Sequence, residues 1–329
     1  MSEAVADNTF TAGDVSTRER YLALGRDYAV VAIILALIVG LALGASNFLT
    51  LRNWMNILDQ AAPLTLIALG TTVVMISGAF DLSTGQILSL AGVIGTEVAF
   101  RTGNPILGVI VGMLIGLPVG AVNGALVGRL NINSFLATLA AGLVMAGLAL
   151  YVASGFSRDL SANSTFTWLG QHRFGTVPVS VIVVVIVFAA LTAIMARTTL
   201  GRHAYAVGSN PEAARLSGIS IVRVRILTYA LGGFAAAIGG MILSTRTGVG
   251  TVVTNADTYT LQAIAAVVIG GTSILGGRGA VWRTLLGVLV LALLQNAFNL
   301  LNVQPYWQQV VAGVIIILAV VANAASGRR

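Results

Sequence analysis

Two amino acids are missing from this chain of 329 residues, cysteine and lysine. The count of Lys plus Arg is 18, and all 18 are arginine. Without cysteine the chain can form no disulfide, no thiolate nucleophile and no cysteine-ligated metal centre. Without lysine it cannot hold nucleotide phosphates in a P-loop of the form GxxxxGKS or GxxxxGKT, because that motif requires its lysine. The chain is therefore not a P-loop ATPase by itself.

Charged residues are also scarce. They make up 9% of the chain, hydrophobic residues make up 57%, and the mean hydropathy is +0.93. Soluble domains carry about 25% charged residues, so this composition indicates a polytopic membrane protein. The two histidines, His172 and His203, are isolated in polar loops, which favours solvation over metal binding. The net charge of +7 is interpreted as an orientation signal rather than as affinity for nucleic acid.

The hydrophobic residues fall into ten segments, each near the length that crosses a hydrocarbon core of about 30 Å. The sequence therefore predicts an all-α integral membrane protein with about ten transmembrane helices. They are expected at 28–45, 60–77, 84–100, 106–127, 134–153, 177–196, 226–245, 259–274, 284–301 and 307–324. The transmembrane domain at 28–324 then lies between an N-terminal segment, 1–27, and a C-terminal tail, 325–329. The N-terminal segment is too long and too acidic for a typical signal peptide, so the first span is expected to stay uncleaved.

The distribution of arginine predicts the orientation of these spans. With both termini in the cytoplasm, thirteen arginines lie inside and five outside, the asymmetry that the positive-inside rule prefers. The polar loop at 197–225, with five arginines, is then cytoplasmic.

This loop carries the signals of its own short helix. Asn210 suits the N-cap, Pro211 the first helical position, Glu212 the positive helix end and Gly218 the exit, which predicts a helix over 211–217. About two turns are not stable alone in water, so the helix is expected to lean on the membrane domain, on a partner, or on both. The alternative is an ordinary connection whose arginines only fix topology.

The stretch SGAFDLSTG at 77–85 places Asp81, Ser83, Thr84 and Gln86 close together between two apolar runs. An acid at membrane depth suggests a functional site, and the glycines would let two half-helices meet at a break. The alternative is a cytoplasmic turn in which Asp81 caps the next helix. A similar run, VVIGGTSILGG at 267–277, is a weak sign of an internal repeat.

Uncharged polar residues recur within the spans. Amides and hydroxyls suit a neutral, hydroxyl-rich solute better than an ion, although hydrogen bonding between helices explains any single one as well. The candidate path residues are Asp81, Ser83, Gln86, Asn123, Asn133, Gln262, Thr272, Ser273 and Asn296. Glycines also recur every fourth residue from Gly108 to Gly128, which predicts close helix packing, with a pore-lining role beside Pro118 and Asn123 as the alternative.

Three stretches resemble one family, the membrane subunits of bacterial ABC importers for monosaccharides, of the ribose, xylose and galactose permease type. They are GRHAYAVGSNPEAARLSGI at 201–219, AIAAVVIGGTSILGGRG at 263–279 and SGAFDLSTG at 77–85. The first two are highly specific together, and the resemblance covers nearly the whole chain.

The resemblance implies a homodimer in the cytoplasmic (inner) membrane that imports a sugar by alternating access. The implied partners are a tandem-domain ATPase in the cytoplasm, which carries ATP and magnesium, and a periplasmic or lipid-anchored sugar-binding protein. This chain would hold no cofactor and no catalytic residue. The stretch 208–219 would be the coupling helix received by the ATPase, and the coupling residues are Asn210, Pro211, Glu212, Ala214, Arg215, Leu216 and Gly218.

The chain departs from the family pattern at two places. Thr260, Leu261 and Gln262 stand where the family often has acidic residues, and Phe80 and Thr84 replace smaller aliphatic residues. These changes bear on which sugar is carried.

Two other functions fit parts of the sequence. One is a self-sufficient secondary transporter or channel that uses Asp81 or Glu97 for a coupling ion. The other is a membrane-embedded enzyme, for which a catalytic pair is hard to assemble because the chain has no cysteine, no histidine within a span and few acids in or beside the spans, Asp81 and Glu97 among them.

Overall fold

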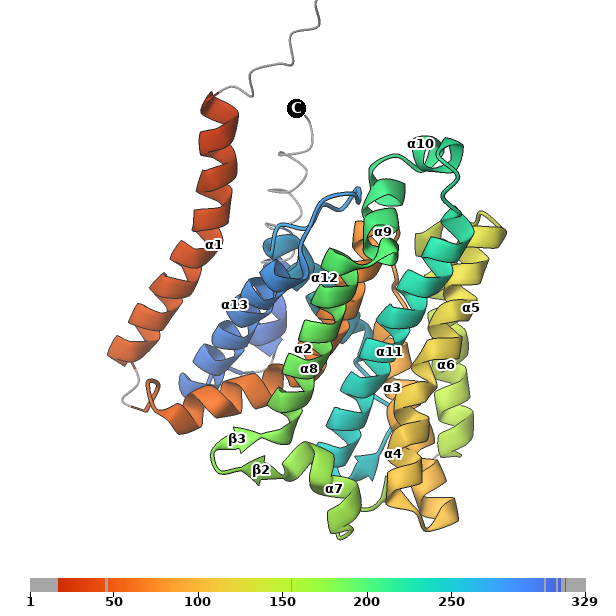
Figure 1. Ribbon diagram of the computed structural model, residues 1–329. Coiled ribbons are helices and arrows are strands. Elements are labelled where there is room, and N and C mark those ends of the chain that lie inside the picture. The colour runs from red at the N-terminus through yellow and green to blue at the C-terminus, as the bar shows by residue number, and fades with distance from the viewer. Residues whose placement is uncertain are drawn as a thin grey trace, which may run out of the picture.

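The structure, a computed structural model, describes residues 17–44, 47–154, 156–304, 306–311, 313, 314 and 317, with side chains from residue 30 onward. Helices make up most of it (Figure 1). They are α1 Thr17–Gly44, α2 Leu51–Ile76, α3 Thr84–Thr102, α4 Pro105–Leu114, α5 Gly116–Arg129, α6 Ser134–Ala153, α7 Ser164–Gln171, α8 Val179–Arg197, α9 Thr199–Ser209, α10 Pro211–Leu216, α11 Ile221–Thr247, α12 Ala256–Ile269 and α13 Val281–Leu300. Four two-residue strands form two antiparallel pairs, β1 Arg158–Asp159 with β4 Val249–Gly250, and β2 Arg173–Phe174 with β3 Val177–Pro178.

The predicted all-helical membrane class is confirmed, but the predicted number of spans is not. Within the described ranges, six helices are long and apolar enough to cross a membrane: α2, α4 and α5 taken together as one span, α6, α8, α11 and α13. The segment Val30–Gly44 and α12 are apolar but shorter. At 14 residues, α12 is about 21 Å long, less than the hydrocarbon core. Most of the predicted last span, the tail 325–329 and residues 1–16 of the N-terminal segment lie outside the described residues.

Local signals explain where several helices begin and break. Asn133 caps α6 by accepting a hydrogen bond of 2.9 Å from the Phe135 amide, and the helix matches its predicted range. The break between α4 and α5 falls at Ile115, three residues before Pro118. Proline has no N–H to bond the carbonyl four residues earlier, so it interrupts the helix here.

Helix α11 is central and packs against α2, α3 and α5. The contact with α5 depends on the glycines spaced by four. A Cβ added to Gly124 would lie 2.6 Å from the Ile226 Cα, and Gly116 and Gly120 approach the α11 backbone as closely. This confirms the predicted close packing.

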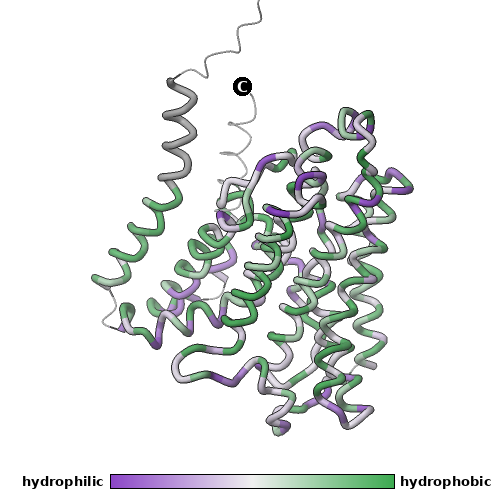
Figure 2. Tube along the Cα trace, in the orientation of Figure 1, coloured by the Kyte–Doolittle hydropathy of each residue, from purple (hydrophilic) through white to green (hydrophobic). Residues whose placement is uncertain are grey.

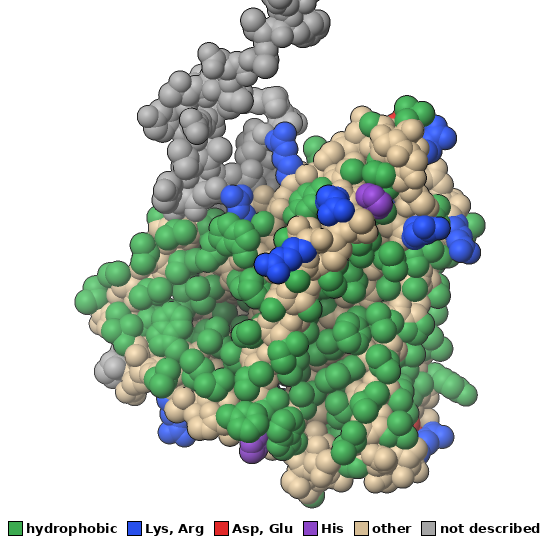
Figure 3. Space-filling view, in the orientation of Figure 1, with side chains coloured by type: hydrophobic (Ala, Val, Ile, Leu, Met, Phe, Trp, Pro, Cys, Tyr) green, Lys and Arg blue, Asp and Glu red, His purple; other side chains and the backbone are tan. Residues whose placement is uncertain are grey.

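The bundle has two polar ends. Helices α9 and α10 lie at one end, and α7, β2 and β3 lie at the other (Figure 1). Hydrophobic residues cover the long helices, whereas hydrophilic residues gather toward the connections (Figure 2). On the face drawn in Figure 3, most of the arginines lie at the end that carries α9 and α10.

Candidate functional site

Helix α10 has the caps that the sequence predicts. The Asn210 side chain accepts a hydrogen bond of 3.0 Å from the Ala213 amide, Pro211 opens the helix, and Gly218 follows it with φ of +79°. The structure ends the helix at Leu216 and makes Ser217 the C-cap. The short helix therefore exists, one residue shorter than predicted.

One residue anchors α10 and others face outward. Ala214 is buried in an apolar cluster with Val207 of α9 and Val224 of α11. Leu216, in contrast, is 78% exposed, and Arg215 and Glu212 form an exposed ion pair of 2.6 Å. The hydrogen bond and charge of Glu212 raise the pKa of Arg215, so its guanidinium stays charged. The outer surface of α10 thus presents an apolar side chain beside fixed charges.

Helix α9 supports α10 and was not predicted from the sequence. It begins after Thr198, whose hydroxyl caps it, and packs against α8, α11 and α2. Gly201, Ala204 and Val207 are its buried residues, at a spacing of three. That spacing, preceded by a threonine N-cap, is the signal that identifies this helix.

The end of α9 meets two distant connections at a group of close backbone contacts, here called the glycine junction: Gly78, Gly208, Gly276 and Gly277. The Gly277 amide donates a hydrogen bond of 3.0 Å to the Ile76 carbonyl at the end of α2. A Cβ added to Gly208 would lie 2.6 Å from the Gly277 nitrogen, and one added to Gly276 would lie 2.5 Å from the Gly78 Cα. The junction therefore joins α9 to the connection between α2 and α3 and to the loop between α12 and α13.

Tyr205 of α9 strengthens this contact. Its hydroxyl donates a hydrogen bond of 2.9 Å to the Gly279 carbonyl. Burial raises the pKa of Tyr205, which keeps the phenol protonated as a donor. The predicted path residues Thr272 and Ser273 lie in the same loop between α12 and α13, where Ser273 accepts a hydrogen bond of 3.2 Å from the Leu275 amide.

Asp81 lies in the connection between α2 and α3 and is only 1% exposed. Its Oδ1 accepts hydrogen bonds from the amide and hydroxyl of Ser83, and the Asn123 amide donates to the Ser83 hydroxyl over 2.8 Å. The Thr138 hydroxyl accepts from the Leu82 amide, 2.9 Å away. The structure thus brings three predicted path residues, Asp81, Ser83 and Asn123, into one buried network that ties the connection to α5 and α6.

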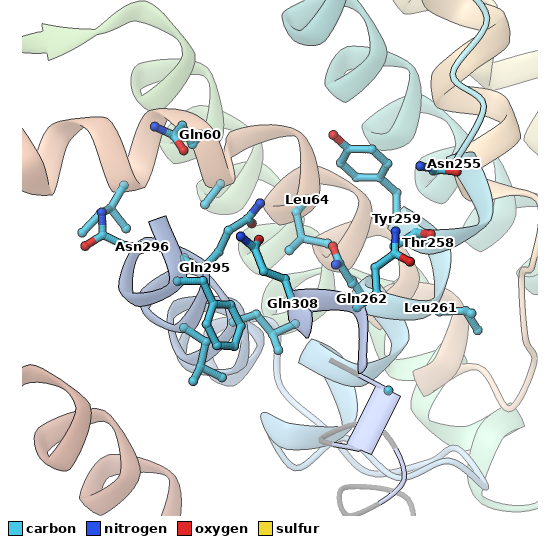
Figure 4. A pocket seen from close by; sticks show the side chains of 18 residues that line it. Gln60, Leu64, Asn255, Thr258, Tyr259, Leu261, Gln262, Gln295, Asn296 and Gln308 are labelled. Carbon is cyan, nitrogen blue, oxygen red and sulfur yellow. The ribbon is translucent and has the colours of Figure 1, made fainter. Parts of the chain in front are cut away.

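The other predicted path residues are dispersed. Gln86 donates a hydrogen bond of 3.0 Å to Asp257, and Asn133 caps α6. Gln262 and Asn296 line a cavity of about 470 Å³ between α2, α12, α13 and the residues Gln308, Gln309 and Gly313 (Figure 4). We call it the amide cavity, because its polar lining includes Gln60, Asn255, Gln262, Gln295, Asn296, Gln308 and Gln309.

Most of these amides were not predicted as site residues. Asn296 pairs with Asn53 through hydrogen bonds of 3.3 and 3.5 Å. Across the described ranges, the side chains of Gln60, Gln262 and Gln295 make no hydrogen bond to the protein. The sequence signal for these residues is the presence of amide side chains within apolar segments. That signal does not show that they face the same cavity.

Two acids at the end opposite α10, Glu97 and Asp59, form ion pairs. Glu97 lies 2.6 Å from Arg101 and 2.9 Å from Arg158. Asp59 lies 3.1 Å from Arg246 and 3.4 Å from Arg173. The ion pair of Glu97 with Arg158 therefore joins α3 to β1.

Comparison with known proteins gives consistent matches along the chain. Residues 53–320 match the family described as the permease component of branched-chain amino acid transport systems. The chain is 41% identical over 278 residues to the ribose import permease protein of Bacillus subtilis (strain 168), covering 84% of this chain and 86% of that protein. It is 36% identical over 297 residues to the ribose import permease protein of Escherichia coli (strain K12), covering 88% and 92%. It is 34% identical over 294 residues to the L-arabinose transport system permease protein of Escherichia coli (strain K12), covering 89% of each. No solved structure matches the chain.

Proposed function

The chain belongs to this family of transport-system permease components, and on that basis we propose that it moves a monosaccharide or a similar polar solute inward across the cytoplasmic membrane. Permease components of ABC transporters are transport subunits, and a separate ATPase hydrolyses ATP. ATP and magnesium are then bound by that partner and not by this chain. The curated relatives that import ribose and arabinose support a sugar as the cargo.

The observation that carries the mechanism is the outward surface of α10. Leu216 and the Arg215–Glu212 pair are exposed on a helix whose Ala214 is buried against α9 and α11. An exposed apolar side chain beside charges is suited to a protein partner. We propose that a cleft on the ATPase receives α10 and that the loop at 197–225 is cytoplasmic.

The remaining parts of the assembly follow from the same proposal. Two copies of the chain form the membrane unit at 28–324, with residues 1–27 and 325–329 in the cytoplasm. A tandem-domain ATPase lies beneath them, and a periplasmic or lipid-anchored sugar-binding protein delivers solute from outside. Transport proceeds by alternating access, in which closure of the ATPase moves α10 and the helices joined to it.

Reconstitution into liposomes tests this function. We expect ribose or L-arabinose to accumulate only when the chain is combined with its ATPase, its sugar-binding protein and ATP. Accumulation by the chain alone under a proton or sodium gradient would support a secondary transporter instead. A matched preparation with a hydrolysis-deficient ATPase controls for leakage through the assembled complex.

A further inference from the structure

Residues 251–255 form a non-helical segment that runs beside α3. Gly250, just before it, closely approaches the Thr96 side chain, with 2.5 Å between a Cβ added to Gly250 and the Thr96 Cβ. The Val253 amide then donates a hydrogen bond of 2.9 Å to the Ser89 hydroxyl. After the segment, the Thr260 hydroxyl accepts a hydrogen bond of 2.9 Å from the Gly85 amide. From Thr96 to Ser89, α3 rises about 10 Å, so the segment runs along roughly a third of the thickness of a bilayer core.

Irregular backbone at membrane depth is tolerated only where protein covers it or water reaches it. This segment lines a second cavity, of about 340 Å³, with the end of α11 and β4. We call it the loop cavity. Thr251, Thr254 and Asn255 are exposed on the segment, and exposed hydroxyl and amide groups at this depth require water or a polar ligand.

The loop cavity and the amide cavity share two lining residues, Asn255 and Tyr259. Asn255 precedes α12 and its side chain does not cap the helix, while Tyr259 lies one turn into it. Figure 4 shows both beside Thr258 and Gln262 at one side of the amide cavity. The two cavities therefore adjoin at the start of α12.

The lining of both cavities is polar without charge. In the described part of the chain, no Asp, Glu, Arg or His lines either one. Each glutamine amide offers two donors and an acceptor, so Gln60, Gln262 and Gln295 can bond hydroxyl groups in either direction. Apolar side chains such as Leu291 and Phe298 complete the wall. This chemistry suits a neutral polyhydroxylated solute and provides no counter-ion for a charged one.

We propose that the two cavities are successive chambers of one solute route, with Asn255 and Tyr259 at the constriction between them. In this route, Gln60, Gln262 and Gln295 bind the hydroxyls of the solute. The assignment rests on the proposed transport function and adds to it the position of the route and its gate. Helix α12 begins at this constriction and is followed by the loop that contributes Gly276 and Gly277 to the glycine junction. A movement of α9 at the junction is therefore transmitted through α12 to the gate.

The absence of cysteine permits a direct test, because each introduced thiol is unique. Gln262→Cys and Gln295→Cys place thiols in the amide cavity, and Leu143→Cys, at a position 71% exposed on the apolar surface of α6, is the matched control. A charged methanethiosulfonate reagent reacts with thiols in water, because it requires the thiolate. We expect modification at 262 and 295 but not at 143, protection by ribose or L-arabinose, and loss of ATP-driven uptake after modification.

The outcomes separate the route from the function. If the unmodified complex imports sugar but thiols at 262 and 295 react no faster than the thiol at 143, the route is wrong while the function stands. Modification without any effect on uptake also overturns the route. If the wild-type complex imports no sugar at all, the proposed function fails first.

A second variant examines the gate independently of thiol chemistry. Tyr259→Ala removes the ring between the cavities, and we expect it to let sugar leak through the complex without ATP. Tyr259→Phe keeps the aromatic ring, so we expect no leakage of sugar in the absence of ATP. Equal leakage from the two variants would contradict a gate at this residue.

Discussion

The amide of Gly277 donates a hydrogen bond of 3.0 Å to the carbonyl of Ile76, across a separation of about 200 residues in the sequence. This bond joins the loop after α12 to the end of α2, and Gly208 of α9 packs against it. Because glycine has no Cβ, three backbones can approach here at once. The contact links the surface proposed for the ATPase to both sides of the proposed solute route.

Gly208→Ala should uncouple the transporter. The added methyl group would overlap the Ile76 carbonyl and the Gly277 amide and push α9 away from the junction. We expect the ATPase to assemble and hydrolyse ATP while sugar uptake per ATP falls. Gly147→Ala in α6 is the matched control, because nothing lies within 4 Å of its added Cβ.

Tyr205→Phe probes the same junction without steric overlap. It removes only the hydrogen bond to Gly279, worth about 1 kcal/mol, so uptake per ATP should fall less than in Gly208→Ala. Wild-type uptake per ATP in Gly208→Ala would show that the junction does not transmit movement.

Arg215→Glu should weaken the complex with the ATPase or uncouple it. The substitution places a carboxylate beside Glu212 on the exposed surface of α10 and leaves the buried Ala214 in place. Co-purification of the ATPase and sugar uptake measure the effect, while membrane insertion should be unchanged. Arg129→Glu, an exposed arginine at the end of α5, makes the same charge change outside α10. Equal results from the two variants would mean that α10 has no special role.

Asp81→Ala should impair uptake without dissociating the proposed permease dimer. It removes the acceptor for the Ser83 amide and hydroxyl, and unpaired buried donors cost about 1 to 3 kcal/mol of stability. Thermal unfolding of the purified chain and uptake by the complex measure the two effects. Full uptake in Asp81→Ala would make Asp81 a turn residue only.

Asp81→Asn separates the shape of this side chain from its acidity. An asparagine keeps an acceptor oxygen for Ser83, so the network should persist. Uptake that survives in Asp81→Asn but not in Asp81→Ala would assign Asp81 a positioning role. Loss of uptake in both, with stability retained in Asp81→Asn, would assign a role to the carboxyl group itself.

The sequence predicted best those features that depend on neighbouring residues. The caps of α10 and the start of α6 are set within four residues of Asn210 and Asn133, and the structure confirms both helices. The glycine spacing predicted the close contact of α5 because it repeats along a single helix. Helix α9 is not predicted, because it follows α8 after a single residue, Thr198, and its polar, arginine-containing sequence is typical of a loop.

Features that depend on distant segments could not be predicted. Gln60, Gln262 and Gln295 come from α2, α12 and α13, and only the fold brings them to one cavity. In the same way, the network around Asp81 requires Asn123 from α5. The count of about ten spans is not confirmed, because hydropathy alone defined them; α12, for example, is too short to cross a bilayer by itself.

Site-directed cross-linking tests most directly whether α10 is the surface that engages the ATPase. Leu216→Cys places the only cysteine of the chain at a position that is 78% exposed on α10, and Tyr151→Cys places one at a position 80% exposed near the opposite end of the bundle. Each thiol is first labelled with a thiol-reactive photo-cross-linker, a maleimide that carries a benzophenone. On illumination of membranes containing the assembled complex, we predict a covalent adduct between the label at 216 and the ATPase and none from the label at 151. An assembled, ATP-hydrolysing complex that gives no adduct at 216 would contradict the account.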